Sequence, residues 1–241
     1  MNTSDDGSWP VAVLFDLDGT LIDSVPDIHA SLNAALADIG LGPLACDVVA
    51  SFVGDGAKTL VARALRYLSA IDRDQSDNAQ DPPHTDHVYK RFIEVYDTAP
   101  CRLTRPYPGA VDALTHLNNQ GVPCAVVTNK PQAVTESVLA GLDLAKHVAA
   151  VVGAQDGRPL KPAPDMILAA LQMLDCSETD AVFVGDSIAD VSAARAAGIP
   201  VIAVRHGYTN IPVDQLGADE IIDHFEQLPA ALTAMSGSKR C

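Results

Sequence analysis

The stretch that decides the fold is residues 11–24, VAVLFDLDGTLIDS, in which an apolar run leads directly into two aspartates, Asp16 and Asp18. Apolar residues occupy successive positions of the run, which is typical of a strand that is buried on both faces of a parallel sheet. The Gly19-Thr20 pair that follows ends the strand. The two carboxylates are therefore expected at the carboxyl end of a central strand, where open α/β sheets bind their ligands.

Asp16 and Asp18 place two negative charges close together at this position. Such a pair is stable when a cation or a proton separates the charges, and a divalent metal ion is the obvious candidate. The alternative is an ordinary Asp-x-Asp-Gly turn without chemistry, because aspartate and glycine are common turn residues.

Apolar runs typical of buried strands alternate with stretches of helical periodicity along the rest of the chain. The expected strands are residues 11–16, 122–128, 148–153, 181–185, 201–204 and 220–222, and the expected helices include 109–119, 131–141, 165–174 and 190–197. This alternation predicts an α/β fold with a doubly wound, parallel, Rossmann-like sheet.

Residues 17–121 separate the first two expected strands, whereas a crossover connection needs only about a dozen residues. Within this interval, apolar residues recur at helical spacing in three segments, which are residues 26–40, 57–70 and 88–96. The polar stretch 72–86 is expected to be an exposed loop. We therefore expect an all-helical cap domain at residues 23–103, inserted into a catalytic core made of residues 1–22 and 104–241.

Composition excludes several classes of function. With 16 Lys and Arg against 31 Asp and Glu, the formal net charge of −15 would repel a phosphate backbone, so nucleic acid is not an expected partner. No run of 18 apolar residues predicts a membrane span, and the acidic start of the chain does not resemble a signal peptide, so a cytoplasmic location is expected. The five cysteines show no C-x-x-C pair, and reduced, mostly buried thiols are expected.

The segment DLDGTLIDS resembles the first motif of the haloacid dehalogenase-like hydrolase superfamily, and three later segments resemble the other motifs of that family in the same order. These are VPCAVVTN, which ends at Thr128-Asn129, LKPAPD, which contains Lys161, and AVFVGDSIAD, which contains Asp186 and Asp190. The resemblance covers about residues 11–223 and makes a simple turn at the first motif a poor explanation.

The resemblance implies phosphoryl transfer through an aspartyl-phosphate. Asp16 would attack phosphorus, and Asp18 would act as general acid to the departing alkoxide, which leaves very slowly without a proton donor. Asp18 would then activate the water that hydrolyses the intermediate. Thr128 would hold phosphate oxygens at the reacting centre, and the positive charge of Lys161 would offset the repulsion between nucleophile and phosphate.

The same resemblance implies a Mg²⁺ cofactor. Asp16, Asp186 and the Asp18 carbonyl would supply its oxygen ligands, and Asp190 would orient Asp186 or a bound water. Gly19 and the backbone amide of Asn129, together with Thr128 and Lys161, would bind the phosphate group. Some residues have an alternative interpretation. Lys161 could be a solvated surface lysine, and Thr20 and Ser187 could simply be turn or helix-entry residues.

Four further segments are similar to the phosphoglycolate phosphatase family, which implies 2-phosphoglycolate, a small anionic phosphate ester, as substrate. These are residues 52–65 (FVGDGAKTLVARAL), 103–110 (LTRPYPGA), 128–131 (TNKP) and 207–210 (GYTN).

The carboxylate of this substrate needs a receptor, and the cap offers one candidate. The Gly54-Asp55-Gly56 turn opens an expected helix whose amino terminus presents free amides, and Lys58 or Arg63 would add a positive charge. Asp55 opposes this role unless it points away or caps the helix. The alternative is a cap helix that merely begins after a flexible turn.

Other functions stay open at this stage. Another small phosphate ester such as a sugar phosphate, or a phosphomutase acting on one, is the alternative within the fold. A non-catalytic binding module is the alternative from a different class, although such a protein should have lost one of Asp16, Asp18, Lys161 or Asp186, and all four are present. The sequence does not distinguish a monomer from a homodimer.

Overall fold

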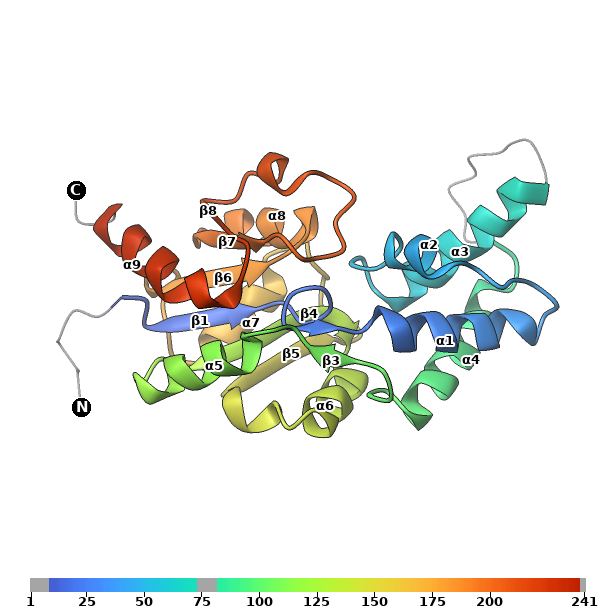
Figure 1. Ribbon diagram of the computed structural model, residues 1–241, viewed down its shortest axis with the longest axis horizontal. Helices are drawn as coiled ribbons and strands as arrows, with labels where there is room; N and C mark the ends of the chain where they lie inside the picture. Colours follow the sequence, from blue (N-terminus) through green and yellow to red (C-terminus); the bar gives the residue numbers. More distant parts are fainter. Residues whose placement is uncertain (1–8, 73–81, 239–241) are drawn as a thin grey trace.

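A six-stranded parallel sheet forms one half of the computed structural model, which describes residues 9–72 and 82–238 (Figure 1). Its strands are β1 (Ala12–Phe15), β4 (Cys124–Pro131), β5 (Ala150–Ala154), β6 (Ala181–Gly185), β7 (Val201–Val204) and β8 (Glu220–Ile222). They are arranged in the order β5-β4-β1-β6-β7-β8, and every neighbouring pair is parallel. The strand order reverses at β1, so the predicted doubly wound sheet is confirmed and its ligand crevice lies at the carboxyl end of β1.

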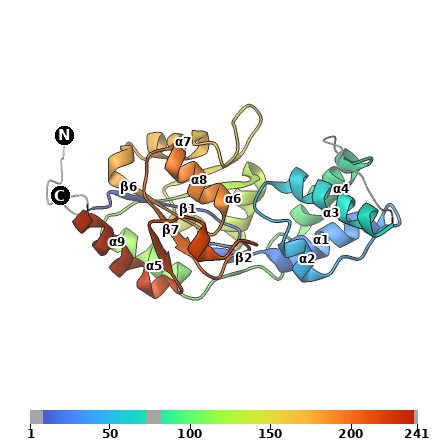
Figure 2. The ribbon, with the colours of Figure 1, turned by 90° about the horizontal axis from the view of Figure 1, so that it is seen from above.

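The sheet is buried on both faces because central strands such as β1 and β7 carry apolar residues at every position. In β1, Val13 and Phe15 belong to one core cluster, whereas Ala12 and Leu14 belong to a second, as expected when successive side chains point to opposite faces. The first cluster is covered by helices α5 (Ala110–Asn119), α6 (Gln132–Gly141) and α9 (Leu228–Ser238), and the second by α7 (Asp165–Met173) and α8 (Ile188–Ala196). Figure 2 shows α7 and α8 on one side of the sheet and α5 and α9 on the other.

Four helices lie together beyond the carboxyl end of β1, on the right of Figure 1. They are α1 (Val25–Ala37), α2 (Cys46–Ala50), α3 (Ala57–Asp72) and α4 (Thr85–Thr98), and we call them the helical segment. Helix α1 packs against α2 and α4, and α3 packs against α4.

Two short strands connect the helical segment to the sheet. β2 (Ile22–Asp23) precedes α1, β3 (Arg105–Pro106) follows α4, and the two form an antiparallel pair in which Ile22 is opposite Pro106. The chain therefore enters and leaves the helical segment at one place, directly after the turn that contains Asp18.

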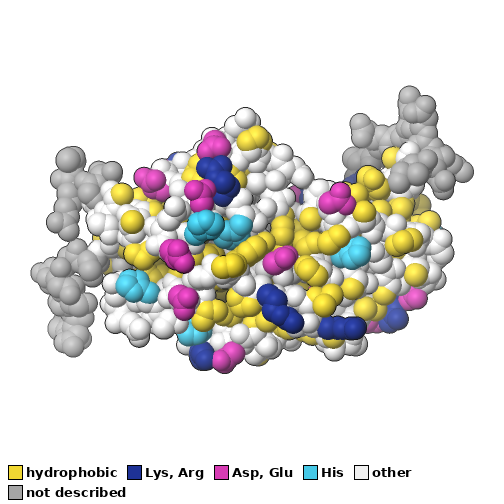
Figure 3. Space-filling view, viewed as in Figure 1, with side chains coloured by type: hydrophobic (Ala, Val, Ile, Leu, Met, Phe, Trp, Pro, Cys, Tyr) yellow, Lys and Arg dark blue, Asp and Glu magenta, His cyan; other side chains and the backbone are white. Residues whose placement is uncertain are grey.

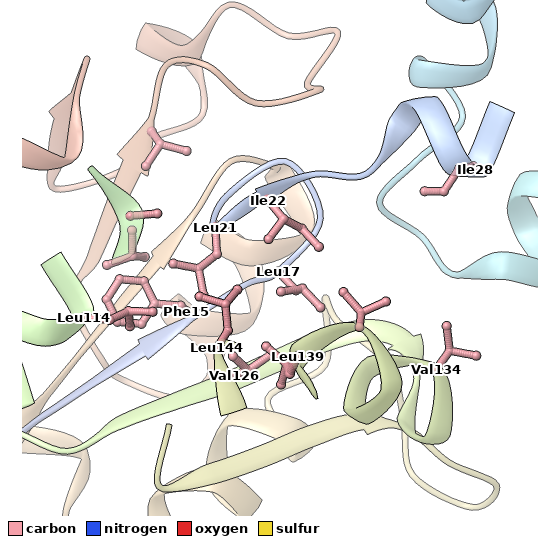
Figure 4. Packing of buried hydrophobic residues seen from close by; sticks show 14 of the residues in the cluster. Phe15, Leu17, Leu21, Ile22, Ile28, Leu114, Val126, Val134, Leu139 and Leu144 are labelled. Carbon is pink, nitrogen blue, oxygen red and sulfur yellow. The ribbon is translucent and has the colours of Figure 1, made fainter. Parts of the chain in front are cut away.

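Apolar packing is continuous between the two halves. Figure 4 shows Phe15, Leu17 and Leu21 packed near Val126 of β4, with Ile28 of α1 on the side of the helical segment. All of these residues belong to one buried cluster that also includes residues of α3 and α4. Burial of Leu17 and Leu21, both fully inaccessible, fixes the turn that carries Asp18.

The sequence missed some elements and misjudged some boundaries. The strands β2 and β3 have two residues each, which is too short for a periodicity to show. The expected helix 88–96 extends over Thr85–Thr98, so the end of the expected loop 72–86 is helical, and residues 73–81 of that loop lie outside the described residues. Helices α2 and α9 were not expected.

The surface agrees with the composition. On the face shown in Figure 3, acidic and basic side chains are scattered and form no continuous basic band. Within the described ranges, no helix is long and apolar enough to cross a membrane. The expectation of mostly buried thiols is wrong for the four described cysteines, since Cys124 is buried but Cys46 is exposed and Cys101 and Cys176 are partly exposed.

Candidate active site

Three carboxylates meet at the carboxyl ends of two neighbouring strands. Asp16 follows β1, Asp186 follows β6, and Asp190 lies in the first turn of α8. One carboxylate oxygen from each lies within 4.8 Å of the others, and the residues are only 6%, 3% and 0% exposed. Because β1 and β6 are adjacent and parallel, their ends bring Asp16 and Asp186 together as the sequence predicted.

Asp186 is held from two sides by groups distant in sequence. The Thr20 hydroxyl donates a hydrogen bond to Oδ1 at 3.0 Å, and the backbone N–H of Tyr208 donates to Oδ2 at 2.8 Å. Two glycines make room for it: Gly19 has a φ of +89°, and a Cβ at Gly207 would lie 2.1 Å from the Asp186 Cβ. The carboxylate therefore has one fixed orientation, facing Asp16.

Asp190 positions its neighbours through a saturated set of hydrogen bonds. Its Oδ2 accepts from the backbone N–H groups of Asp186 at 3.1 Å and Ser187 at 2.9 Å, and its Oδ1 accepts from Lys161 Nζ at 2.6 Å. Ser187 is the N-cap of α8 and forms a capping box with Asp190, so its helix-entry role is confirmed.

Lys161 lies inside the acidic cluster. It is 3% exposed, and its Nζ lies 2.7 Å from Asp16 Oδ1 and 2.6 Å from Asp190 Oδ1 and donates to the Val127 carbonyl at 2.9 Å. Burial opposes its charge, but Asp16 and Asp190 raise its pKa above the usual value, so the side chain is an ammonium. The alternative of a solvated surface lysine is therefore wrong.

The cluster has an excess of negative charge that suits a hard divalent cation. Burial raises the pKa of Asp16 to about 7, with Lys161 lowering it and Asp190 raising it. Burial and the charges of Asp190 and Asp16 also raise the pKa of Asp186 well above its usual value. Among the described residues, buried Asp16 Oδ1 has an ion pair with Lys161 but no hydrogen bond of good geometry. The oxygen donors present therefore fit a metal ion such as Mg²⁺.

Asp18 forms a second cluster together with two residues that the sequence analysis did not assign to the site. Lys130 Nζ lies 3.1 Å from both carboxylate oxygens of Asp18 and donates to the Tyr96 hydroxyl at 3.0 Å. Burial opposes the charge of Lys130, but Asp18 raises its pKa above the usual value. Asp18 is thus joined through Lys130 to helix α4.

A pocket lies between the sheet and the helical segment, and it is lined by Asp16 of the acidic cluster and by Asp18, Lys130 and Tyr96 of the second cluster. The sheet side contributes mainly polar residues, which are Asp16, Asp18, Thr128, Asn129 and Lys130, with Pro131 and Val134. The helical segment contributes mainly apolar residues, which are Ile28, Val53, Ala57, Leu60, Phe92 and Ile93, with Gly54, Gly56 and Tyr96. The pocket can therefore hold a small molecule with one reactive polar end.

Thr128 and Asn129 lie inside β4, which continues to Pro131 instead of ending at these two residues as expected. They follow Val127, where the regular pairing with β5 is interrupted. The Thr128 hydroxyl accepts from the Lys130 backbone N–H at 3.3 Å. The Asn129 side chain donates to the carbonyls of Gly54 and Lys161, both at 3.0 Å, and accepts from the Lys161 backbone N–H at 2.9 Å. Asn129 therefore fixes the lysine loop and touches the helical segment.

The expected carboxylate receptor is only partly assembled around this pocket. Gly54 and Gly56 line it, but Lys58 does not, and its ammonium pairs with Asp86 at 2.8 Å on the surface. Arg63 pairs with Asp55 and lines a different opening on the other side of the Gly54 turn. Asp55 is thus paired with Arg63 and does not line the pocket that contains Asp16 and Asp18.

Tyr208 is a further residue that sequence reasoning missed. Its hydroxyl donates to Asp23 Oδ1 at 2.7 Å and accepts from the Ser24 backbone N–H at 2.8 Å, while its own N–H holds Asp186. The residue thus connects Asp186 to the strand that enters the helical segment. The segment GYTN was noticed in the sequence, but its contacts join positions far apart in the chain.

This fold and this arrangement of aspartates and lysine define a haloacid dehalogenase-like hydrolase. The family model described as "Haloacid dehalogenase-like hydrolase" matches residues 13–204, and the chain belongs to that family. Its relatives include the phosphoglycolate phosphatase of Rhodospirillum rubrum, which is 40% identical over 219 residues, 91% of this chain and 89% of that protein. The plasmid-encoded phosphoglycolate phosphatase of Cupriavidus necator is also 40% identical, over 92% of this chain and 93% of that protein.

A solved structure is similarly close. The crystal structure of a predicted phosphoglycolate phosphatase from Haemophilus somnus 129pt superposes with a TM-score of 0.83 at 30% identity, covering 91% of this chain and 96% of the other. The similarity extends over the sheet and the helical segment alike.

Proposed function

We propose that the protein is a magnesium-dependent phosphatase that hydrolyses 2-phosphoglycolate to glycolate and phosphate through an aspartyl-phosphate on Asp16. The observation that carries the proposal is the position of Asp16, held beside Lys161 in a buried acidic cluster and facing the pocket that also contains Asp18. The names of the relatives support the substrate.

Asp16 is the nucleophile in this proposal. Its attack on phosphorus brings together two anions, and the Lys161 ammonium 2.7 Å from Asp16 Oδ1 offsets their repulsion. Asp190 and the Val127 carbonyl hold that ammonium in place, so it needs no reorganisation during the reaction. Mg²⁺, held by Asp16, Asp186 and the Asp18 carbonyl, would neutralise charge on the phosphoryl oxygens.

Asp18 acts on the leaving group. It lies two residues after the nucleophile and reaches the same pocket, so it can donate a proton to the departing alkoxide and later accept one from the attacking water. The Thr128 hydroxyl and the backbone amide of Asn129 hold phosphate oxygens, with Gly19 allowing the turn to pass close to Asp186. The Asn129 side chain is engaged elsewhere and does not take this role.

The helical segment is proposed as a cap domain, residues 23–103, on a core of residues 1–22 and 104–241. Its apolar side chains close one wall of the pocket and exclude water from the reacting centre. The paired strands β2 and β3 are the connection at which such a cap would move. A cytoplasmic location stays a prediction from the sequence.

A panel of phosphate esters assayed with and without Mg²⁺ tests the proposal. We expect phosphate release from 2-phosphoglycolate at a higher kcat/KM than from glucose 6-phosphate or p-nitrophenyl phosphate, and no release in excess chelator. Better hydrolysis of a sugar phosphate would favour the alternative phosphatase, and isomerisation of a sugar phosphate without release would favour the phosphomutase. No reaction with any ester would favour a non-catalytic binding module.

A further inference from the structure

The pocket beside Asp18 contains one cationic side chain among its described lining residues, and this is Lys130. The side chain is 6% exposed, and its Nζ contacts both carboxylate oxygens of Asp18 and the Tyr96 hydroxyl. The ion pair with Asp18 compensates the buried charge of Lys130, but the proposed reaction gives this cation no task toward the substrate.

The role of Asp18 indicates where the substrate's carboxylate would lie relative to Lys130. A general acid must lie within hydrogen-bond distance of the ester oxygen, so Asp18 marks where that oxygen sits. In 2-phosphoglycolate the carboxylate carbon is two bonds beyond the ester oxygen. The ammonium of Lys130, at 3.1 Å from the Asp18 oxygens, is therefore next to the place where the substrate's carboxylate arrives.

The surroundings leave the carboxylate few other partners. The wall opposite Lys130 consists mainly of apolar side chains such as Ile28, Leu60 and Phe92, which offer no hydrogen bond. An ion pair in such a low-dielectric pocket is stronger than in water. The cations expected from the sequence, Lys58 and Arg63, pair with Asp86 and Asp55 outside this pocket.

We propose that Lys130 is the residue that recognises the carboxylate of the substrate. Its ammonium has three donors, so it can give one to the substrate carboxylate in place of a contact with Asp18 and keep the Tyr96 hydroxyl as its anchor on helix α4. Discrimination between 2-phosphoglycolate and uncharged esters then depends on Lys130. The inference rests on the proposed phosphatase function and names the specificity residue of that site.

The test compares two substrates that differ at one end. 2-Hydroxyethyl phosphate has the same two-carbon chain with an uncharged hydroxymethyl group in place of the carboxylate. In Lys130→Met we expect the ratio of kcat/KM for 2-phosphoglycolate to that for 2-hydroxyethyl phosphate to fall by about tenfold to a hundredfold. This is the effect of losing one charge-assisted hydrogen bond. The change should come mainly from a higher KM for 2-phosphoglycolate. Effects on Asp18 that are common to both substrates cancel in this ratio.

Three further variants make the comparison specific. Lys130→Gln carries the same test if thermal unfolding shows that Lys130→Met does not fold, and Lys130→Arg should restore part of the ratio. Lys146→Met removes an exposed lysine that pairs with Asp143 and should leave the ratio within about twofold of the wild type.

The outcomes separate this inference from the proposed function. A wild-type preference for 2-phosphoglycolate that survives within about twofold in folded Lys130→Met or Lys130→Gln overturns the inference and leaves the function standing. Collapse of the ratio in Lys58→Met or Arg63→Met but not in Lys130→Met assigns the receptor to the expected cap cation instead. Absence of any wild-type preference overturns the substrate assignment and the inference together.

Discussion

Replacing Lys161 with methionine removes the one ammonium that lies within the described acidic cluster, while the methionine fills much of the same volume. Lys161 Nζ is 2.7 Å from Asp16 Oδ1 and 2.6 Å from Asp190 Oδ1, and the side chain is 1% exposed. In Lys161→Met, Asp190 keeps its bonds from Asp186 and Ser187, but Asp16 Oδ1 loses its ion-pair partner.

The size of the effect follows from this burial. Removing one partner of a buried ion pair typically costs about 3–5 kcal/mol, because the remaining charge stays buried without compensation. We expect a loss of this size in the free energy of unfolding of the metal-free protein. We also expect kcat to fall about a hundredfold to a thousandfold, as when one preorganised electrostatic group is removed from an active site.

Urea unfolding at pH 8 in the presence of a chelator measures the stability effect. At this pH Asp16, whose pKa is about 7 beside Lys161, is mostly ionised in the wild type, so the wild-type protein has the ion pair that the variant lacks. Lys146→Met is the matched control, since its exposed pair with Asp143 contributes about 0–1 kcal/mol. A folded Lys161→Met protein that loses less than about 1 kcal/mol and keeps wild-type kcat would refute this account of the cluster.

Three other predictions concern the proposed Mg²⁺ site and the residues around it. Gly207→Ala should lower the free energy of unfolding by about 1–3 kcal/mol, because the new Cβ would lie 2.1 Å from Asp186 Cβ. The displaced Asp186 should also weaken the stabilisation by Mg²⁺ in thermal unfolding. Unchanged stability would show that the loop adapts freely. Ca²⁺ should inhibit phosphate release competitively with Mg²⁺ without supporting it, since it tolerates more ligands and spoils the in-line geometry; full activity with Ca²⁺ would contradict this. Burial lowers the pKa of His206 below the ordinary 6.5, so its neutral form is favoured in the fold and its contribution to stability should be lost as pH falls below about 6.5. His206→Phe should flatten the pH dependence of urea unfolding in that range, and an unchanged slope would exclude this role.

The sequence predicted the sheet and the acidic cluster because both depend on local patterns. Asp16 and Asp186 each follow a buried strand directly, and parallel neighbours bring their ends together without any further information. Lys161 was found through its motif, although only the structure shows that it is buried between two carboxylates.

The contacts across the pocket could not be predicted in the same way. Lys130 follows Thr128 and Asn129 directly, yet its partners Asp18 and Tyr96 lie 112 and 34 positions away in the chain. The sequence predicts Lys58 near the substrate because it lies in the first turn of an expected helix. In the structure Lys58 pairs with Asp86 on the surface, because the packing of α3 against α4 decides which face of α3 lines the pocket. Periodicity defines a helix and its apolar face, whereas the partner of an exposed charge depends on tertiary packing.

Phosphate release from 2-phosphoglycolate by Asp16→Asn, measured beside the wild type with Mg²⁺, tests the central claim most directly. The amide has nearly the same shape as the carboxylate but cannot attack phosphorus or bind Mg²⁺ as an anion. The account predicts turnover by the wild type and none by an Asp16→Asn protein with a cooperative thermal unfolding transition. Near wild-type kcat in that folded variant would contradict the aspartyl-phosphate mechanism.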